Sequence, residues 1–267
     1  MDKVHEHYVK VAEECGSSKQ STMKDTFIRD KEVQKIEEVL RVVAKFSSSN
    51  QRPAVLEIGC GNGYTAEYLS QRLHLPMTCI DYCQELLDIA KKRNVPDAVF
   101  KEGNVLNLEF PDASFDIVFT ERCLVNLDTW AKQQQALDEI RRVLKKGGIF
   151  VMVECFIECH QSLNDAREAV GLERIPQPFH NVFFERAPFL QFIQEKFVDC
   201  SVAYPEWELG NCEHFLSSYY FGSKVLYPAL AAGKKELVYN NKFIEFFTHL
   251  PPYGNYGYVN MFVLKKV

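Results

Sequence analysis

A series of glycines directly after an apolar segment has the residue types of a ligand-binding turn. Residues 54–58 are apolar except for Glu57, as expected of a strand covered on both faces of a parallel sheet. Gly59, Gly61 and Gly63 follow, and their lack of a Cβ atom allows a sharp turn and a close approach of the backbone to a ligand. A buried carboxylate is costly without a partner, so we expect Glu57 to point toward a loop or a ligand.

The spacing around this turn predicts a nucleotide cofactor and leaves its class open. Residues 61–66 also satisfy the relaxed G-x-G-x-x-A form of the dinucleotide fingerprint, so NAD is one interpretation of this turn. Asp81 stands at the end of the next apolar segment, where a carboxylate can accept hydrogen bonds from both ribose hydroxyls. Asp81 therefore fits an NAD site as well as a site for another adenosine cofactor.

Strands and helices are expected to alternate beyond the turn. Apolar segments predict further strands at 77–80, 99–100, 115–120 and 149–153. Helical spacing predicts intervening helices at 64–73, 84–93 and 129–144, the last ending at Gly147 and Gly148. This alternation indicates an α/β fold with a Rossmann-like, mostly parallel sheet, whose ligands gather at the carboxyl ends of the strands. Glu57, Asp81, Asn104 and Glu121 would share that edge.

The flanking regions predict a lid and a cap. We interpret residues 1–46 as an N-terminal helical lid and 47–267 as the catalytic domain. In the second half, a helix is expected at 186–196 and strands at 197–204 and 256–264. Residues of about 207–254 form an insert rich in Tyr and Phe, which is expected to cap the sheet edge, although such aromatic stripes are also typical of a core.

Composition excludes several classes of function. The chain has 267 residues, 46% of them hydrophobic, and a formal net charge of −5, with no basic run of the kind that binds nucleic acid. Its 9 cysteines are odd in number and lie mostly in apolar segments, which favours free thiols in a reducing, cytoplasmic compartment. Cys155, Cys159 and His160 lack the C-x-x-C spacing of a metal site, so no metal is expected. No signal peptide or membrane span is expected.

Several motifs together resemble the class I S-adenosylmethionine-dependent methyltransferases. They are the E-x-G-x-G-x-G turn at 57–63, the acidic Asp81, the G-N-V at 103–105, the F-D-I-V-F strand at 115–119 and the L-K-K-G-G at 144–148. Lys146 departs from the proline that is usual in the last motif. The resemblance covers about Val55 to Val153 and implies a seven-stranded sheet with S-adenosylmethionine as cofactor and S-adenosylhomocysteine as product.

The resemblance also implies roles for individual residues. The turn Gly59, Gly61 and Gly63 would pass under the methionine part of the cofactor, with Glu57 beside it. Asp81, followed by Tyr82, would bind the ribose hydroxyls. Asn104 and Val105 would hold the adenine, although Asn104 departs from the commoner aspartate. Glu121 would face the methyl donor. Arg29 would grip the cofactor carboxylate, unless it is only a solvated arginine at the start of a helix.

Candidate bases are histidines, whose unperturbed pKa lies near working pH. His180 in the loop Gln177-Pro-Phe-His-Asn181 is the first candidate, and His249 beside Pro251 is the second. His5, His7 and Tyr8 could instead belong to the N-terminal lid. Each histidine is equally typical of a hydrogen-bonded loop residue without a catalytic role.

The sequence therefore predicts an S-adenosylmethionine-dependent methyltransferase that acts on a small organic acceptor. O-methylation of a saccharide or natural product is favoured, because residues 217–228 resemble bacterial methyltransferases of such pathways. Three alternatives stay open: a small-molecule N-methyltransferase, a non-catalytic cofactor-binding or scaffold protein, and an NAD-dependent oxidoreductase. The expected partners include no nucleic acid and no membrane, and the oligomeric state is left open.

Overall fold

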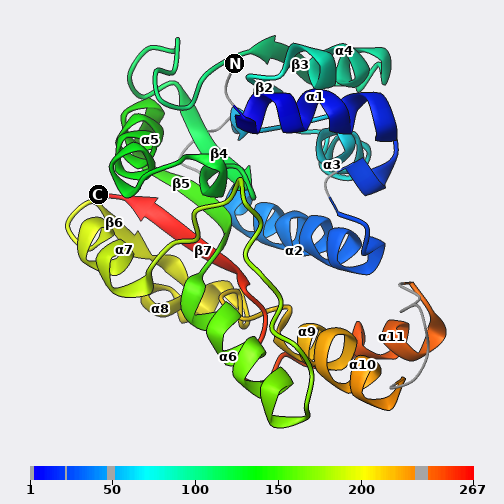
Figure 1. Cartoon of the computed structure of the whole chain (residues 1–267). Helices are drawn as coiled ribbons and strands as arrows, with labels where there is room; N and C mark the ends of the chain where they lie inside the picture. The colour runs from blue at the N-terminus through cyan, green and yellow to red at the C-terminus, as the bar shows by residue number, and fades with distance from the viewer. Residues whose placement is uncertain (1–2, 22, 47–51, 232–239) are drawn as a thin grey trace.

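A seven-stranded sheet forms the centre of the computed structural model, which describes residues 3–21, 23–46, 52–231 and 240–267. The strand order is β3-β2-β1-β4-β5-β7-β6, and only β7 runs antiparallel to its neighbours (Figure 1). The strands are β1 (Val55–Ile58), β2 (Met77–Asp81), β3 (Ala98–Glu102), β4 (Phe115–Glu121), β5 (Leu144–Cys155), β6 (Phe197–Asp199) and β7 (Val259–Lys266). The predicted Rossmann-like, mostly parallel sheet is confirmed.

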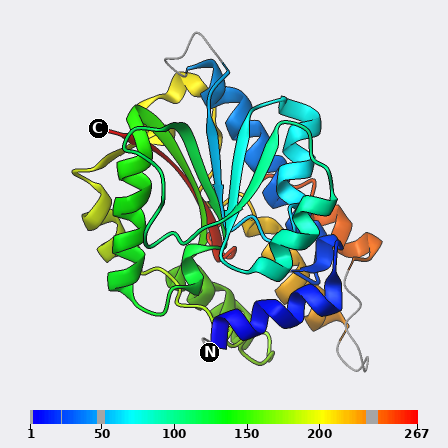
Figure 2. The same cartoon turned by 90° about the horizontal axis from the view of Figure 1, so that it is seen from above.

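Helices cover both faces of this sheet. Figure 2 shows α2, α3 and α4 on one face and α5 and α7 on the other. The longer helices are α1 (Lys3–Cys15), α2 (Thr26–Lys45), α3 (Tyr64–Leu73), α4 (Gln84–Lys92), α5 (Trp130–Val143), α6 (Ile157–Ala169) and α7 (Arg186–Ile193). The shorter ones are α8 (Cys200–Ala203), α9 (Ser217–Phe221), α10 (Tyr227–Leu230) and α11 (Lys242–Phe247). Burial on both faces explains why β1 and the middle of β4, Ile117 to Phe119, are mainly apolar.

The junction of α5 and β5 differs from the prediction. The helix ends at Val143 and the strand begins at once with Leu144, so the two glycines lie inside the strand. Gly147 has φ +73°, and the pairing of β4 with β5 shifts its register between Phe115 and Ile117. The glycines thus form a bulge that continues the sheet and do not end the helix.

The predicted strand at 197–204 is wrong beyond its third residue. β6 stops at Asp199, and α8 follows. The Asp199 carboxylate accepts a hydrogen bond from the backbone N–H of Ser201 at 2.9 Å, which caps the new helix. The sequence analysis also did not predict α6, which begins directly after β5.

The expected N-terminal lid divides into two helices with different partners. α2 buries Ile28, Ile36 and Leu40 in the main core of the domain. α1 instead packs in a small separate cluster with Cys83 and Leu86 beside α4, and it lies over one edge of the sheet (Figure 2). Only α1 therefore has the position of a lid, and we call it the lid helix.

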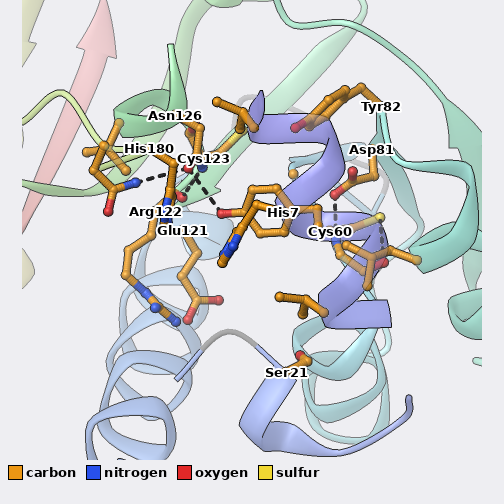
Figure 3. Close-up of a pocket in the computed structure, with 18 of the residues that line it drawn as sticks. His7, Ser21, Cys60, Asp81, Tyr82, Glu121, Arg122, Cys123, Asn126 and His180 are labelled. Carbon is orange, nitrogen blue, oxygen red and sulfur yellow. Dashed lines mark hydrogen bonds between the residues drawn. The ribbon is translucent and has the colours of Figure 1, made fainter. Parts of the chain in front are cut away.

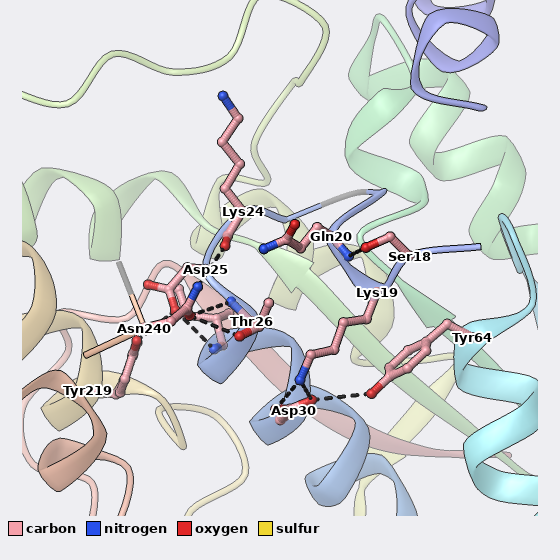
Figure 4. Close-up of polar contacts among 11 residues, drawn as sticks. Ser18, Lys19, Gln20, Lys24, Asp25, Thr26, Asp30, Tyr64, Tyr219 and Asn240 are labelled. Carbon is pink, nitrogen blue, oxygen red and sulfur yellow. Dashed lines mark hydrogen bonds and ion pairs between the residues drawn. The ribbon is translucent and has the colours of Figure 1, made fainter. Parts of the chain in front are cut away.

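The aromatic insert lies against the start of α2. Asp25 caps α2, and its carboxylate also accepts a hydrogen bond from Tyr219 Oη at 2.7 Å (Figure 4). Lys224 Nζ donates a further hydrogen bond to it at 3.0 Å. Asn240 accepts a hydrogen bond from the Thr26 hydroxyl at 2.9 Å. The insert thus fixes the N-terminal end of α2. Residues 232–239 of the insert lie outside the described residues.

All 9 cysteines are free thiols. Cys159 lies 3.4 Å from Asn260 Oδ1, to which its thiol donates a hydrogen bond. Among the described ranges of the chain, no helix combines the length and apolar character that crossing a membrane requires.

Candidate functional site

A cavity of about 810 Å³ lies at the carboxyl ends of β1, β2 and β4. Its floor includes Gly59 and Gly61 of the glycine turn, and its roof is the lid helix with His7 and Tyr8. The loop that contains His180 closes a further side (Figure 3). Segments from four separate parts of the chain therefore enclose one space at the edge where parallel strands place ligands.

The three glycines of the turn have different tasks. Gly59 has φ +78°, and a Cβ atom there would lie 2.6 Å from Cys123 Sγ. Gly61 has φ +52° and only open space where its Cβ would be, so its backbone can be approached from the cavity. Gly63 precedes α3 and packs against Ala90, and it is not among the residues that line the cavity. The turn thus presents backbone without side chains to the cavity at Gly61.

Asp81 is fixed beside this turn. Its carboxylate accepts hydrogen bonds from the backbone N–H groups of Gly61 at 2.7 Å and Cys83 at 2.9 Å. Burial raises the pKa of Asp81, and these N–H donors act in the opposite direction. The backbone N–H of Tyr82 is a third donor to this carboxylate. A carboxylate has about four lone-pair positions, so about one remains for a ligand. Tyr82, 38% exposed, follows it at the cavity wall.

Asn104 and Val105 form the next part of the wall. Val105 is buried, whereas Asn104 is exposed to solvent at the cavity rim. The Asn104 side-chain oxygen already accepts a hydrogen bond from the backbone N–H of Leu106 at 2.9 Å. That oxygen shapes the turn after β3, which limits what it can offer to a ligand.

A buried ion pair lies below the turn. Arg29 pairs with Glu121, whose side chain is only 4% exposed, and Thr65 links the two. The Thr65 hydroxyl accepts from Arg29 Nη2 at 2.9 Å and donates to Glu121 at 2.8 Å. Burial alone would raise the pKa of Glu121, but Arg29 and Arg122 outweigh it and hold this pKa below its usual value. Glu121 is therefore ionised at neutral pH.

The other buried acids near the site differ from Glu121. Burial, reinforced by the negative charge of Glu121, raises the pKa of Glu57 to about 8. Burial also raises the pKa of Glu32 to about 8, although Arg122 lies 3.2 Å from its carboxylate and opposes this. Glu57 is thus mostly protonated at neutral pH, and Glu32 ionises less readily than an exposed glutamate. The sequence analysis missed Glu32, because nothing in its local sequence shows that α2 turns it toward β4.

Arg122 lies directly after β4 in a backbone conformation that is rare for its residue type. Its φ is +52°, and it directly follows Glu121. Glu154 supports the segment after it by accepting hydrogen bonds from the backbone N–H groups of Cys123, Leu124 and Val125, at 3.1, 3.0 and 3.2 Å. This segment brings Asn126 to the cavity.

Asn126 joins the lid helix to the His180 loop. Its side-chain oxygen accepts hydrogen bonds from Tyr8 Oη at 3.1 Å and from Asn181 Nδ2 at 3.0 Å (Figure 3). Above it the rings of His7 and His180 stack with centroids 4.2 Å apart. Asn126 and Asn181 were not among the predicted site residues. The sequence hints at them only by position, because Asn126 follows β4 closely and Asn181 is next to His180.

His180 lines the cavity as a neutral imidazole. Burial, with His7 as a second cause, lowers the pKa of His180 to about 4. Its Nδ1 atom is buried and has no hydrogen-bond partner among the described residues. His249, the second candidate base, is exposed to solvent and does not line this cavity.

The aromatic insert does not contribute to the cavity wall. None of its described residues between 207 and 254 lines the cavity, which is closed by the lid helix and the His180 loop instead. The aromatic rings of the insert pack on one another, as Phe247 does against Phe243 at 5.4 Å between centroids. The insert also joins the main core of the domain, to which Trp207, Tyr219 and Tyr220 belong.

Residues 56–152 match the protein family described as a methyltransferase domain. The chain carries a class I methyltransferase domain. The cofactor of this domain is S-adenosylmethionine, and the family match favours it over NAD. Gly61, with open space beside its backbone, and the acceptor position left on the Asp81 carboxylate fit such a cofactor. Its amino acid part needs close backbone approach, and its ribose needs a carboxylate acceptor.

Relatives of this methyltransferase domain cover only part of the chain. A methyltransferase-family protein of Encephalitozoon cuniculi is 39% identical over 121 residues, which are 45% of this chain and 53% of that protein. The malonyl-(acyl-carrier protein) O-methyltransferase of a Paenibacillus species is 28% identical over 45% of this chain and 47% of its own length. The chain spans about half the length of the curated relatives it matches.

Among solved structures, one chain of a Haloferax volcanii complex between the Trm112 methyltransferase activator and a methyltransferase has a TM-score of 0.55. It is 16% identical, and the match covers 93% of this chain and 97% of that chain. This likeness shows the shared fold.

Proposed function

We propose that this protein transfers the methyl group of S-adenosylmethionine to an oxygen of a small organic acceptor. The observation that carries the proposal is the enclosed cavity of about 810 Å³, with the glycine turn at one end and His7, His180 and Asn126 at the other. This volume is near the upper end of the roughly 300–1,000 Å³ range of small-molecule sites. It leaves room for an acceptor beside the cofactor.

The end of the cavity at the glycine turn has residues suited to each part of S-adenosylmethionine. Gly59 and Gly61 would lie under the methionine part and Asp81 would accept the ribose hydroxyls, with Tyr82 covering that side. The adenine would lie against Val105, and Asn104 would reach it from the rim.

The N–H donors of Arg29 that Glu121 and Thr65 do not use are available to the cofactor carboxylate. Its Nη atoms are used by Glu121 and Thr65, whereas its Nε is buried without a hydrogen-bond partner among the described residues. Glu121 would therefore act by holding Arg29, and Glu57 would fill the space beneath the turn as a neutral acid. Both Arg29 and Glu121 reach the cavity wall.

The acceptor end would hold the nucleophile on the axis of the S–CH₃ bond. When bound, the cofactor supplies an activated methyl group, and positioning of the nucleophile is worth roughly 7–11 kcal/mol of the barrier. His180 lines the cavity as a neutral imidazole, so it would accept the proton of an acceptor hydroxyl. Asn126 and Asn181 would orient His180 and the lid helix around the acceptor.

N-methylation is the second candidate, and the low pKa of His180 favours it. An imidazole with a pKa of about 4 is a weak base, whereas a neutral amine brings its own lone pair and needs none. The absence of a basic run in the sequence supports a small acceptor over a nucleic acid. The free thiols suit work in the reducing cytoplasm.

Calorimetry with S-adenosylhomocysteine and a turnover screen test the proposal. We expect the product cofactor to bind to the purified chain, and small-molecule fractions of cell extract to release S-adenosylhomocysteine from S-adenosylmethionine. Binding of S-adenosylhomocysteine without turnover in any fraction would favour a non-catalytic cofactor-binding or scaffold protein. Lack of binding at millimolar ligand, or binding of NAD in its place, would reject the proposed function.

A further inference from the structure

His5, Cys83 and Glu85 form a cluster outside the cofactor cavity. Each offers one ligand atom, and these three atoms lie within 4.8 Å of one another. His5 belongs to the lid helix, whereas Cys83 precedes α4 and Glu85 lies in its first turn. None of the three lines the cavity described above.

Two of the three side chains hydrogen-bond to each other, and the third lacks a partner at one ring nitrogen. His5 Nδ1 is buried and has no hydrogen-bond partner among the described residues. Cys83 occupies the cap position of α4, yet its side chain makes no capping hydrogen bond. Its Sγ atom instead lies 3.4 Å from a carboxylate oxygen of Glu85. An imidazole nitrogen, a thiol and a carboxylate thus converge from two helices.

We propose that His5, Cys83 and Glu85 bind one zinc ion that fastens the lid helix to α4. Zinc takes nitrogen, sulfur and oxygen ligands at roughly 2.0–2.3 Å in a tetrahedral arrangement, in which a water molecule completes a set of three protein ligands. The thiol gives its proton to solvent and binds as the thiolate. A thiolate ligand selects zinc over Mg²⁺ or Ca²⁺, which prefer oxygen.

The position of the cluster links it to the cavity. Cys83 is two residues after Asp81, and the His5 ring packs edge-on against Tyr82 with centroids 5.6 Å apart. The lid helix is otherwise held on α4 by a small apolar cluster of Ala12, Cys83 and Leu86. An ion shared by the two helices would therefore favour the closed lid.

Cobalt substitution tests the site without reference to methyl transfer. Co²⁺ added to the chelator-treated full chain should bind with one-to-one stoichiometry and give a thiolate-to-metal charge-transfer absorption. Cys83→Ser should abolish this absorption, and Zn²⁺ should displace the Co²⁺. Cys15→Ser is the matched control, since Cys15 is a half-buried thiol on the same lid helix and outside the cluster. Absence of the absorption, or its persistence in Cys83→Ser, would overturn the proposal.

A second variant guards against misfolding of Cys83→Ser. Glu85 is exposed, so Glu85→Gln should leave the fold intact. Glu85→Gln should weaken Zn²⁺ affinity by at least about tenfold. Loss of a residue that only contacts a metal ligand already costs about that much, and Glu85 would be a ligand itself. Hydrogen exchange of amides in residues 3–15 should slow when Zn²⁺ is added to the native chain and not in Glu85→Gln at the same Zn²⁺ concentration. Unchanged affinity in this variant, or unchanged exchange in the native chain, would contradict the zinc clasp.

Discussion

His7 on the lid helix and His180 in the opposite loop stack almost in parallel, with an angle of 23° between their rings. Two positively charged imidazoles would repel each other in this contact, and burial already lowers the pKa of both residues. The charged groups facing His7 are Glu14, which opposes the shift, and Lys10, which adds to it. The closed lid thus requires neutral histidines.

Stability should depend on pH through this pair. His180 has a pKa of about 4 in the folded chain against about 6.5 in an unfolded one, so the unfolded state binds the proton more readily. The stabilisation is complete above about pH 6.5 and is lost as the pH falls through about 4. We expect His180→Gln to flatten the dependence of the unfolding free energy on pH in this window. An unchanged slope would show that the stack does not hold the lid.

His180→Ala tests the proposed base. If His180 takes the proton of a hydroxyl acceptor, turnover should fall by roughly a hundredfold or more while cofactor affinity is kept. His249→Ala is the matched control, because this histidine is exposed and away from the cavity. Single-turnover kinetics and calorimetry measure the two quantities. Full activity of His180→Ala would favour an amine acceptor that needs positioning alone.

Gly61→Ala and Gly16→Ala form a matched pair. Both glycines have φ +52° and open space at the position of a Cβ atom, so each substitution should cost about 1–2 kcal/mol of stability. Only Gly61 lies in the cavity wall. We therefore expect similar losses of stability by denaturant unfolding, but a loss of S-adenosylhomocysteine affinity in Gly61→Ala alone. Equal affinities in the two variants would exclude close backbone approach at Gly61.

Asp81→Ala should weaken cofactor binding by about 1.5–3 kcal/mol, because hydrogen bonds to a charged group are lost. Asp88→Ala is the control, since Asp88 is an exposed aspartate on α4. Calorimetry with S-adenosylhomocysteine compares the two. Unchanged affinity in Asp81→Ala would reject the ribose role.

Glu121→Leu should destabilise the fold by about 3–5 kcal/mol, because it leaves the buried Arg29 guanidinium without its counter-charge. The double variant Arg29→Met/Glu121→Leu removes both charges and should recover part of this loss. Cofactor affinity should stay low in the double variant if Arg29 grips the cofactor. Recovery of affinity together with stability would assign the pair a structural role only. Chemical unfolding and calorimetry distinguish these results.

The sequence by itself determined the sheet and the cofactor edge. β1, β2, β4 and β5 are largely buried and mainly apolar segments, whereas the edge strand β3 is not buried. The glycines and Asp81 lie at strand ends, where chain order alone places them together. The secondary structure predicted from local patterns was wrong where one or two residues determine whether a helix or a strand forms. Asp199 caps a helix inside a segment that alternates like a strand, and the glycines after Leu144 bulge within β5.

Only the tertiary structure decided what closes the cavity and which charges lie beneath it. Tyr8, Asn126 and Asn181 meet across more than a hundred residues of chain, and no sequence spacing encodes that contact. The same holds for Glu32 and Arg122, whose pairing depends on the rotation of α2 against β4. The aromatic insert packs away from the cavity because Asp25 anchors it through Tyr219 and Lys224. The sequence shows that the insert is rich in Tyr and Phe. Which part of the protein these rings pack against depends on contacts between residues far apart in the chain.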